Sequence, residues 1–535
     1  MADATMVAKI INSPASTSLL DFVKGETNAN VRVELHKGIR VHVESSLTGA
    51  YTQVPEPFNK TKEEAWPVVF DMEPCSNKKE CDNRMRLSIR ENLLKMAILY
   101  SGTDRGLKAT RGYFAINTPV ESIPDYTGLS LYINTKKLVW SEWQEAIDHI
   151  LTQQEIDPNA DLKTMTLNRV VTNFGYLDYN GMVFNHVKVN VASNRQQAWS
   201  GSLSSNLFNG QFSWTPGTSN KHPQLKAHFD YLTIPQKTLV DKTLKLVPKT
   251  TDSLPSLTLG IDRLKYVDYD LGALTISAKN SGFGENQAWI LDSFEVKTKE
   301  ANLAVNGIWD SGKKQKSQTT LNATLDVSDI GDLLERAHYQ QVINSGRGQV
   351  NAKLKWNGAP VDFNTSSLHG QISTQLLSGQ ITQVEPGAGR LMSLMSLQQL
   401  LRRFALDFRD VVGRGFVFDS INGTVEINNG LATTDSLRIV GPQATILSQG
   451  WLDLNTLTQK VKISILPDIS LGGASVALAV ANPLLGVGSF LAQLALQAPL
   501  SQLFSVEYEV SGTVDKPVIQ KVSDQSRTVT ASQAP

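Results

Sequence analysis

The stretch LNATLDV, residues 321–327, sets the pattern that decides the fold. Its odd-numbered residues are apolar and its even-numbered residues are polar, and a β-strand places alternate side chains on opposite faces. The same alternation recurs in VRVEL at 31–35, IRVHV at 39–43, LSLYI at 129–133, VKVNV at 187–191, LTISA at 274–278 and VNAKLKW at 350–356. This repetition predicts a mainly β fold whose strands each have one apolar and one polar face.

Turn signals accompany these strands. Asn-Gly occurs six times, beginning at residues 180, 209, 306, 357, 422 and 429. Both residues tolerate the positive φ that a type I′ hairpin turn requires. Not every pair need be a two-residue hairpin, but the set predicts short antiparallel connections and a meander topology.

Few segments have helical spacing. SEWQEAIDHIL begins at Ser141, a plausible N-cap, and SDIGDLLERA begins at Ser328. Short helices of this kind usually cover an end or an edge of a sheet. A third, amphipathic helix is predicted at 389–404, where apolar residues recur every three or four positions and Gln399, Arg402 and Arg403 mark the opposite side.

The size and charge of the chain limit its class. With 535 residues it exceeds the roughly 100–200 expected of one domain. Its 51 basic residues balance its 51 acidic ones, so composition gives no support for nucleic-acid binding, which needs a basic surface. We expect β repeats at 1–235, a linker or crossover at 236–256, further β repeats at 257–468, an apolar helical hairpin at 469–506, a closing strand at 507–521 and a disordered tail at 522–535.

No catalytic or metal-binding constellation is evident. The eight histidines show no metal-ligand spacing, and no G-x-S-x-G elbow occurs. GIWDSGKK, residues 307–314, departs from a phosphate loop at Lys314 and precedes no helical pattern. We therefore expect a protein that is not an enzyme and carries no cofactor or metal.

Cys75 and Cys81 are the chain's two cysteines. Two interpretations stay open: a pair of free thiols in a loop, or a local disulfide that clips a hairpin. The second requires an oxidising compartment such as the periplasm.

Residues 469–506 contain no charged side chain, but Pro483, Gly486 and Gly488 interrupt the stretch. The two helical pieces that remain are shorter than the ~20 residues of a membrane-spanning helix. They either plug one end of the β structure or enter or lie on a membrane. The candidate membrane-contact residues of this stretch and of the 389–404 helix are Leu391, Leu394, Leu397, Leu401, Arg402, Arg403, Phe404, Val476, Leu478, Val480, Leu484, Leu485, Phe490, Leu491 and Leu494.

Several blocks carry a resemblance to a known family. They are PGAGRLMSLMSLQQLLRRFALDFRDVVGRGFVFD at 386–419, the Pro-x-Pro block at 47–70, the Trp-plus-Gly hairpin unit at 198–214, the repeats at 253–278 and 431–454, and SGTVDKP at 511–517. Together they resemble the AsmA-like YhdP family of Gram-negative envelope proteins. The first block, the 431–454 repeat and SGTVDKP are the most specific of them.

The resemblance implies an elongated, twisted antiparallel sheet folded along its length into a hydrophobic groove. It implies a membrane-associated periplasmic protein that transfers phospholipid between the inner and outer membranes and supports the outer-membrane barrier. Members are anchored in the inner membrane by an N-terminal helix. The start MADATMVAKIINSP shows no signal pattern, so we expect the anchor and the N-terminal part of the family's length to be missing here.

The alternating strands supply the candidate groove residues: Val187, Val189, Val191, Leu274, Ile276, Leu321, Leu325, Val350 and Leu354. An ordinary β-sandwich would show the same alternation, because its two apolar faces pack together. The alternative function is a periplasmic scaffold or assembly factor for outer-membrane proteins, with strand edges that pair with clients. Lipid adducts would favour the first function and protein adducts the second.

Overall fold

The computed structural model describes residues 22–36, 38–76, 81–103, 106–152, 165–236, 254–282, 287–311, 317–337, 343–382, 416–442, 444–467 and 506–522. These residues are mainly strands, which confirms the predicted mainly β class. They divide into two compact units, one of Met1–Thr218 and Gln224–Thr233, the other of Ser219–Pro223 and Ile234–Pro535. Each unit is described by itself.

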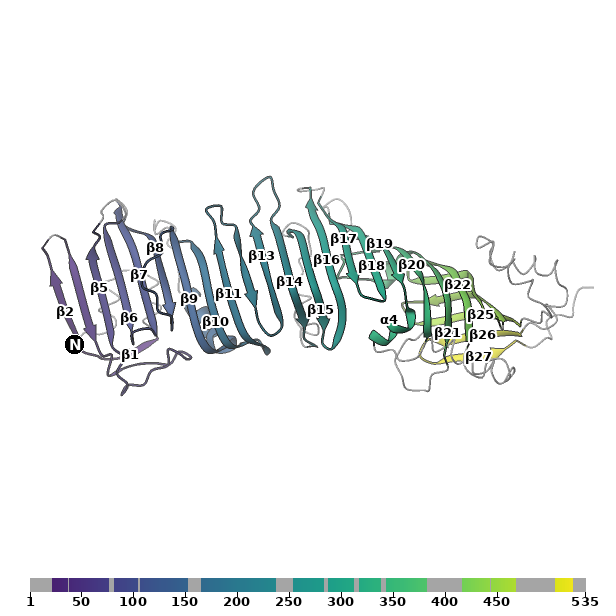
Figure 1. Ribbon diagram of the computed structural model, residues 1–535, viewed down its shortest axis with the longest axis horizontal. Helices are drawn as coiled ribbons and strands as arrows, with labels where there is room; N and C mark the ends of the chain where they lie inside the picture. The colour runs from purple at the N-terminus through teal and green to yellow at the C-terminus, as the bar shows by residue number, and fades with distance from the viewer. Residues whose placement is uncertain are drawn as a thin grey trace, which may run out of the picture. The chain divides into compact units, whose positions relative to one another are not determined.

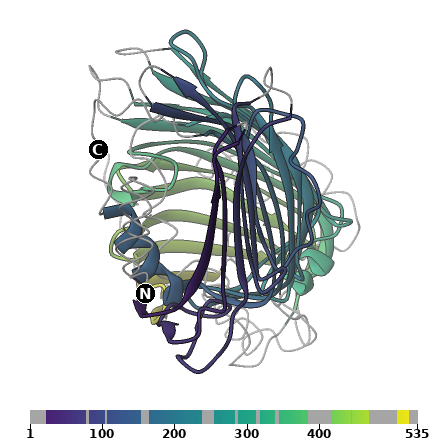
Figure 2. The same cartoon turned by 90° about the vertical axis from the view of Figure 1, so that its left-hand side faces the viewer.

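The first unit is a sheet in which neighbouring strands pair in the order β2-β3-β5-β6-β7-β8-β9-β10-β11-β12-β13-β14, with a small separate pair, β1–β4 (Figure 1). Its strands are bent along their length, so that one face of the sheet is concave (Figure 2). The strands are β1 Val23–Gly25, β2 Ala29–Glu34, β3 Arg40–Ser45, β4 Ala50–Thr52, β5 Val68–Pro74, β6 Asn83–Ile89, β7 Leu94–Thr103, β8 Gly106–Ile116, β9 Gly128–Val139, β10 Leu167–Tyr179, β11 Met182–Ser193, β12 Trp199–Ser204, β13 Phe208–Thr215 and β14 Gln224–Ile234.

The second unit pairs its strands in sequence order from β15 to β27, each antiparallel to the next. The strands are β15 Ser256–Tyr266, β16 Tyr269–Ser281, β17 Ala288–Lys297, β18 Ala301–Asp310, β19 Gln318–Val327, β20 Ile343–Asn357, β21 His369–Ile381, β22 Phe416–Asn428, β23 Leu431–Val440, β24 Ala444–Asp453, β25 Thr458–Pro467, β26 Val506–Thr513 and β27 Pro517–Lys521. A 3-10 helix, η3, spans Thr365–Ser367.

One part of the first unit departs from the predicted antiparallel meander. β9 pairs in parallel with both β8 and β10. Parallel neighbours cannot be joined by a tight turn and need a crossover. Residues 117–127 make the first crossover, and helix α3, Trp140–Thr152, opens the second.

Five of the six Asn-Gly pairs fall into two groups, and the sixth lies at the end of β20, where Asn357 is the last strand residue and Gly358 has a positive φ. Asn180-Gly181 and Asn429-Gly430 are two-residue turns with positive φ at both positions, as predicted. The pairs at 209, 306 and 422 lie inside strands β13, β18 and β22. There the glycine makes room for a neighbouring side chain: a Cβ at Gly307 would lie 2.5 Å from Cδ2 of Leu321.

Both predicted helices that fall in the described residues are present, with shifted starts. α3 begins at Trp140, so Ser141 lies within it and is not its N-cap. α4 spans Ile330–Arg336, and its N-cap is Asp329, whose carboxylate accepts a hydrogen bond from the Asp332 backbone N–H at 3.0 Å. The helix predicted at 389–404 and most of the linker at 236–256 lie outside the described residues.

Candidate functional site

The strand register of the first unit aligns apolar side chains across the sheet. Directly paired residues lie on the same face, so a chain of pairs defines a row on that face. One such row crosses the strands from β2 to β14 through Val31, Val43, Phe70, Leu87, Met96, Phe114, Leu131, Val170, Val191, Gly201, Phe212 and Ala227. The predicted groove residues Val189 and Val191 lie on this face, and Val187, two residues before Val189, points the same way.

The second unit repeats this arrangement. A row crosses eight consecutive strands, β15 to β22, through Leu259, Ile276, Phe294, Val305, Ala323, Ala352, Ile372 and Val425. Neighbouring rows on the same face contain Leu274, Leu325 with its partner Val350, and Leu321 with its partner Leu354. All six groove residues predicted in this unit therefore share one face. We call this face of each unit its apolar face.

The reverse face of each sheet is polar. In the second unit Thr324 donates to Asn351 at 2.9 Å, and Lys462 forms an ion pair with Glu507 at 3.1 Å. In the first unit Arg86 pairs with Glu73 at 3.0 Å. The register therefore separates an apolar face from one suited to water.

A short ladder of titratable groups lies on that polar face in the first unit. His42 approaches Asp71 at 2.7 Å and Glu44 at 3.1 Å. The hydrogen bond to Asp71, then that to Glu44, raises the pKa of His42 above 6.5. The two carboxylates thus stabilise the protonated form of His42.

The apolar faces are unevenly exposed, and the predicted groove residues Val187, Val191 and Leu274 are buried. Val31 and Val33 on strand β2 are 60% and 55% exposed, and Leu321, Leu325, Val350 and Leu354 are half-buried. Apart from the small β1–β4 pair, the described strands belong to one continuous sheet, so no second large sheet is present to cover either apolar face. A β-sandwich would bury these side chains against a second sheet. The described strands therefore do not form the sandwich that the alternation also allowed.

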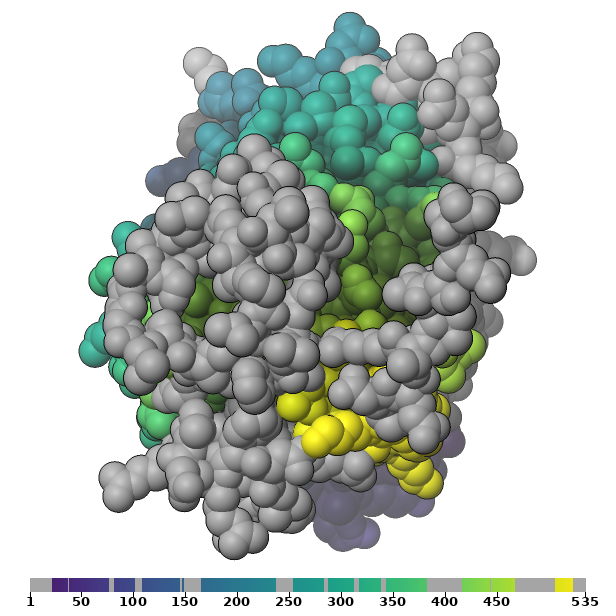
Figure 3. Space-filling model, turned by 90° about the vertical axis from the view of Figure 1, so that its right-hand side faces the viewer, coloured from purple at the N-terminus to yellow at the C-terminus, as the bar shows by residue number. Residues whose placement is uncertain are grey.

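The second unit also contains a fully packed region, and Leu325 at the border of the apolar face packs against it. Here β19–β27 and α4 share a buried apolar cluster, with Phe416, Phe418, Ile446 and Ile465 all completely inaccessible to solvent. The ring of Phe418 lies over two glycines, Gly379 and Gly346. Their missing side chains provide the space that this ring fills. In a space-filling view, green atoms of the second unit are visible in a hollow beside the yellow atoms of β26 and β27 (Figure 3).

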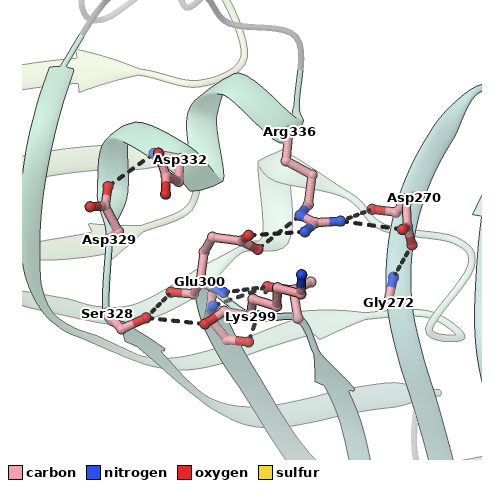
Figure 4. A network of polar contacts seen from close by, with 10 residues as sticks. Asp270, Gly272, Lys299, Glu300, Ser328, Asp329, Asp332 and Arg336 are labelled. Carbon is pink, nitrogen blue, oxygen red and sulfur yellow. Dashed lines mark hydrogen bonds and ion pairs between the residues drawn. The ribbon is translucent and has the colours of Figure 1, made fainter.

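Helix α4 is fixed at the edge of this cluster by an ion-pair network (Figure 4). The Arg336 guanidinium donates to both carboxylate oxygens of Glu300, at 2.8 and 2.9 Å, and lies 3.4 Å from Asp270. The hydrogen bonds from Arg336 lower the pKa of Glu300 to about 2. On the inner side of the helix, Ile330 is buried in the cluster. Both ends of α4 are thereby held to the sheet.

The candidate membrane-contact residues, from Leu391 to Phe404 and from Val476 to Leu494, lie outside the described residues. The strand pairs that flank these two segments are described. Ile381 pairs with Phe416, and Ile465 pairs with Val506. Three of these four residues belong to the buried cluster and the fourth packs against it, so both segments leave the sheet at that cluster.

Two further features bear on the site. Cys75 and Cys81 form a disulfide, with their Cα atoms 5.9 Å apart, between β5 and β6. None of the helices in the described part of the chain has the length and apolarity needed to cross a bilayer. A contact that the sequence does not indicate joins α3 to the loop before β5: Phe58 contacts Trp143 edge to face, with ring centroids 6.1 Å apart. No local signal connects residues so distant in the chain.

Comparison with known proteins identifies the family of this chain. The family model described as "YhdP protein" matches residues 3–519. The Escherichia coli (strain K12) protein named "Intermembrane phospholipid transporter YhdP" is 32% identical over 234 residues, which cover 43% of this chain and 18% of that relative. No solved structure matches the chain. Because the family model covers nearly its whole length, the chain belongs to the YhdP protein family.

Proposed function

We propose that this chain transfers phospholipid between the inner and outer membranes, without catalysis, along a groove formed by its apolar faces. The observation that carries the proposal is an apolar face that continues from strand to strand and that no described sheet covers. Exposure of such a surface to water is unfavourable, so we expect an apolar ligand to cover it. The name of the E. coli relative, an intermembrane phospholipid transporter, supports phospholipid as that ligand.

The groove binds acyl chains by burial alone. Removing one methylene from water stabilises the complex by about 0.8 kcal/mol. Adjacent strands lie about 4.8 Å apart and present similar apolar rows, so a chain shifted by one strand finds nearly the same contacts. A lipid can therefore slide from row to row without leaving a deep, specific site.

The apolar rows offer no binding partner for the lipid headgroup. The row from Leu259 to Val425 contains no charged residue, and a phosphate moved onto it would lose its hydration without a partner. We place the apolar face on the concave side of the strands, with the headgroup at the open side. Lipid then moves with its tails inside and its headgroup in water.

The compartment fits an envelope protein. The Cys75–Cys81 disulfide is stable in an oxidising compartment, which the periplasm is and the cytosol is not. The two segments that leave the sheet at the buried cluster contain the predicted membrane-contact residues. We place that end of the second unit at a membrane, by family resemblance the outer one, where transfer would maintain the permeability barrier.

Photocrosslinking in cells tests the proposal. A photoreactive residue at Leu325 lies on the apolar face, and one at Thr324 lies on the polar face of the same strand. Phospholipid adducts at 325 and not at 324 are expected. Protein adducts at 325, or no adducts in a stably folded protein, would overturn the proposal, and protein adducts would favour the scaffold alternative.

A further inference from the structure

Along one edge of the first unit, two segments far apart in the sheet touch. Phe58 belongs to the loop between β4 and β5, and Trp143 belongs to α3, which follows β9. Four strands, β6 to β9, separate β5 from β10 in the sheet, a distance of about 24 Å at the usual strand spacing. The Phe58–Trp143 contact therefore bridges the ends of several strands.

The loop side of this bridge is firmly held. Lys60 is buried, and its ammonium donates to the backbone carbonyls of Ala50, Glu64 and Thr61 at 2.7, 2.8 and 2.9 Å. Burial lowers the pKa of Lys60, but its three donors are all satisfied. The backbone N–H of Trp66 also donates to the Ser46 carbonyl at 2.6 Å. The loop is thus a fixed arm that presents Phe58.

The helix side of the bridge rests on aromatic contacts. Trp140, the first residue of α3, lies against Tyr179 with ring centroids 5.7 Å apart. One turn later Trp143 meets Phe58, and Trp143 and Ile147 are half-buried while Glu142 and Gln144 are exposed. An edge-to-face pair of aromatic rings is a weak interaction. By contrast, a two-pronged ion pair and a buried isoleucine hold α4.

Helix α3, which the Phe58–Trp143 contact holds, lies on the concave side of the sheet. Figure 2 shows α3, in blue, on the concave side of the strands of the first unit. We propose that α3 is a side gate of the lipid groove and that Phe58 and Trp143 are its latch, an inference that rests on the proposed function. Phospholipid enters or leaves the first unit sideways when the latch opens.

Crosslinking the latch tests the gate in the full-length protein in cells. Phe58→Cys and Trp143→Cys are combined and joined with a short bismaleimide, which leaves the native Cys75–Cys81 disulfide untouched. We expect the crosslinked protein to lose phospholipid transfer, whereas each single-cysteine variant treated with the same reagent retains it. Trp143→Ala, which removes the latch without locking it, should retain transfer as well.

A fixed brace would give the reverse result. If the crosslinked protein transfers lipid normally and Trp143→Ala does not, the gate proposal is overturned. A photoreactive residue at Met96, on the apolar face, separates this failure from failure of the proposed function. If position 96 forms lipid adducts and the crosslinked protein transfers lipid normally, the gate alone is contradicted. If position 96 forms no lipid adducts in any variant or in the parent protein, the lipid groove itself is contradicted.

Discussion

The uncovered apolar face of the second unit and its buried cluster are built from the same kinds of side chain on the same alternating strands. Phe294, on the face, is half-buried, whereas Phe418, in the cluster, is completely buried. The difference comes from what surrounds each ring. Phe418 lies in a cluster that includes α4, and its ring fills the space that Gly346 and Gly379 leave. Alternation alone therefore makes an apolar face, and the covering elements decide whether it becomes a core or a surface for a ligand.

The two phenylalanines give the largest contrast in stability. Phe418→Ala should lower the free energy of unfolding by about 3–5 kcal/mol, because it removes a buried ring and leaves a cavity. Phe294→Ala should cost clearly less, since its ring is already partly in water. Urea unfolding of the purified variants measures both. Equal losses for the two variants would mean that the face is as tightly packed as the cluster.

Acid should weaken the ion pair that holds α4 to the sheet. The pKa of Glu300 is about 2 in the folded protein, below its ordinary value of 4.5. Its ion pair with Arg336 therefore stabilises the fold fully above about pH 4.5, and this contribution is lost as the pH falls toward 2. The loss is at most about 3 kcal/mol, from the size of the shift.

Arg336→Met isolates that contribution. The variant should be less stable at neutral pH and should show a shallower loss of stability between pH 4.5 and 2, with Arg347→Met, an exposed change on β20, as the control. Unfolding curves across this pH range measure the effect. An unchanged acid profile in Arg336→Met would show that α4 is held by its apolar contacts alone.

The smallest effect is expected on the polar face. His42 has a pKa raised above 6.5 by Asp71 and Glu44, so any stabilisation from its charge is present at lower pH and lost as the pH rises through that raised value. The His42 side chain is 37% exposed, so water screens its ion pairs and global stability should barely change. NMR titration should place the His42 pKa above 6.5 and show that Asp71→Asn lowers it. A pKa at or below 6.5 in the parent protein would contradict the ladder.

The local alternation was enough to predict which side chains share a face. Leu321, Leu325, Val350 and Leu354 lie on one face because a two-residue period is a property of each strand alone. The same reasoning could not predict the parallel pairing of β9, because pairing depends on the path of the chain between strands. It therefore gave an all-antiparallel topology.

Long-range packing was beyond the sequence pattern for a related reason. Phe418 looks no different in sequence from an open-face residue such as Phe294, since the glycines and the helix that cover it are distant in the chain. The contact of Phe58 with Trp143 was missed in the same way. Short elements with their own signals, α3 and α4, were found, and their partners were not.

The central claim is that phospholipid travels on the apolar face. Phospholipid transfer in cells that express Leu325→Lys or Thr324→Lys tests it most directly, because the two positions are adjacent on β19 but lie on opposite faces. With both variants stably folded, the account predicts that Leu325→Lys blocks transfer and that Thr324→Lys does not. Normal transfer by Leu325→Lys, or equal loss in both variants, would contradict it.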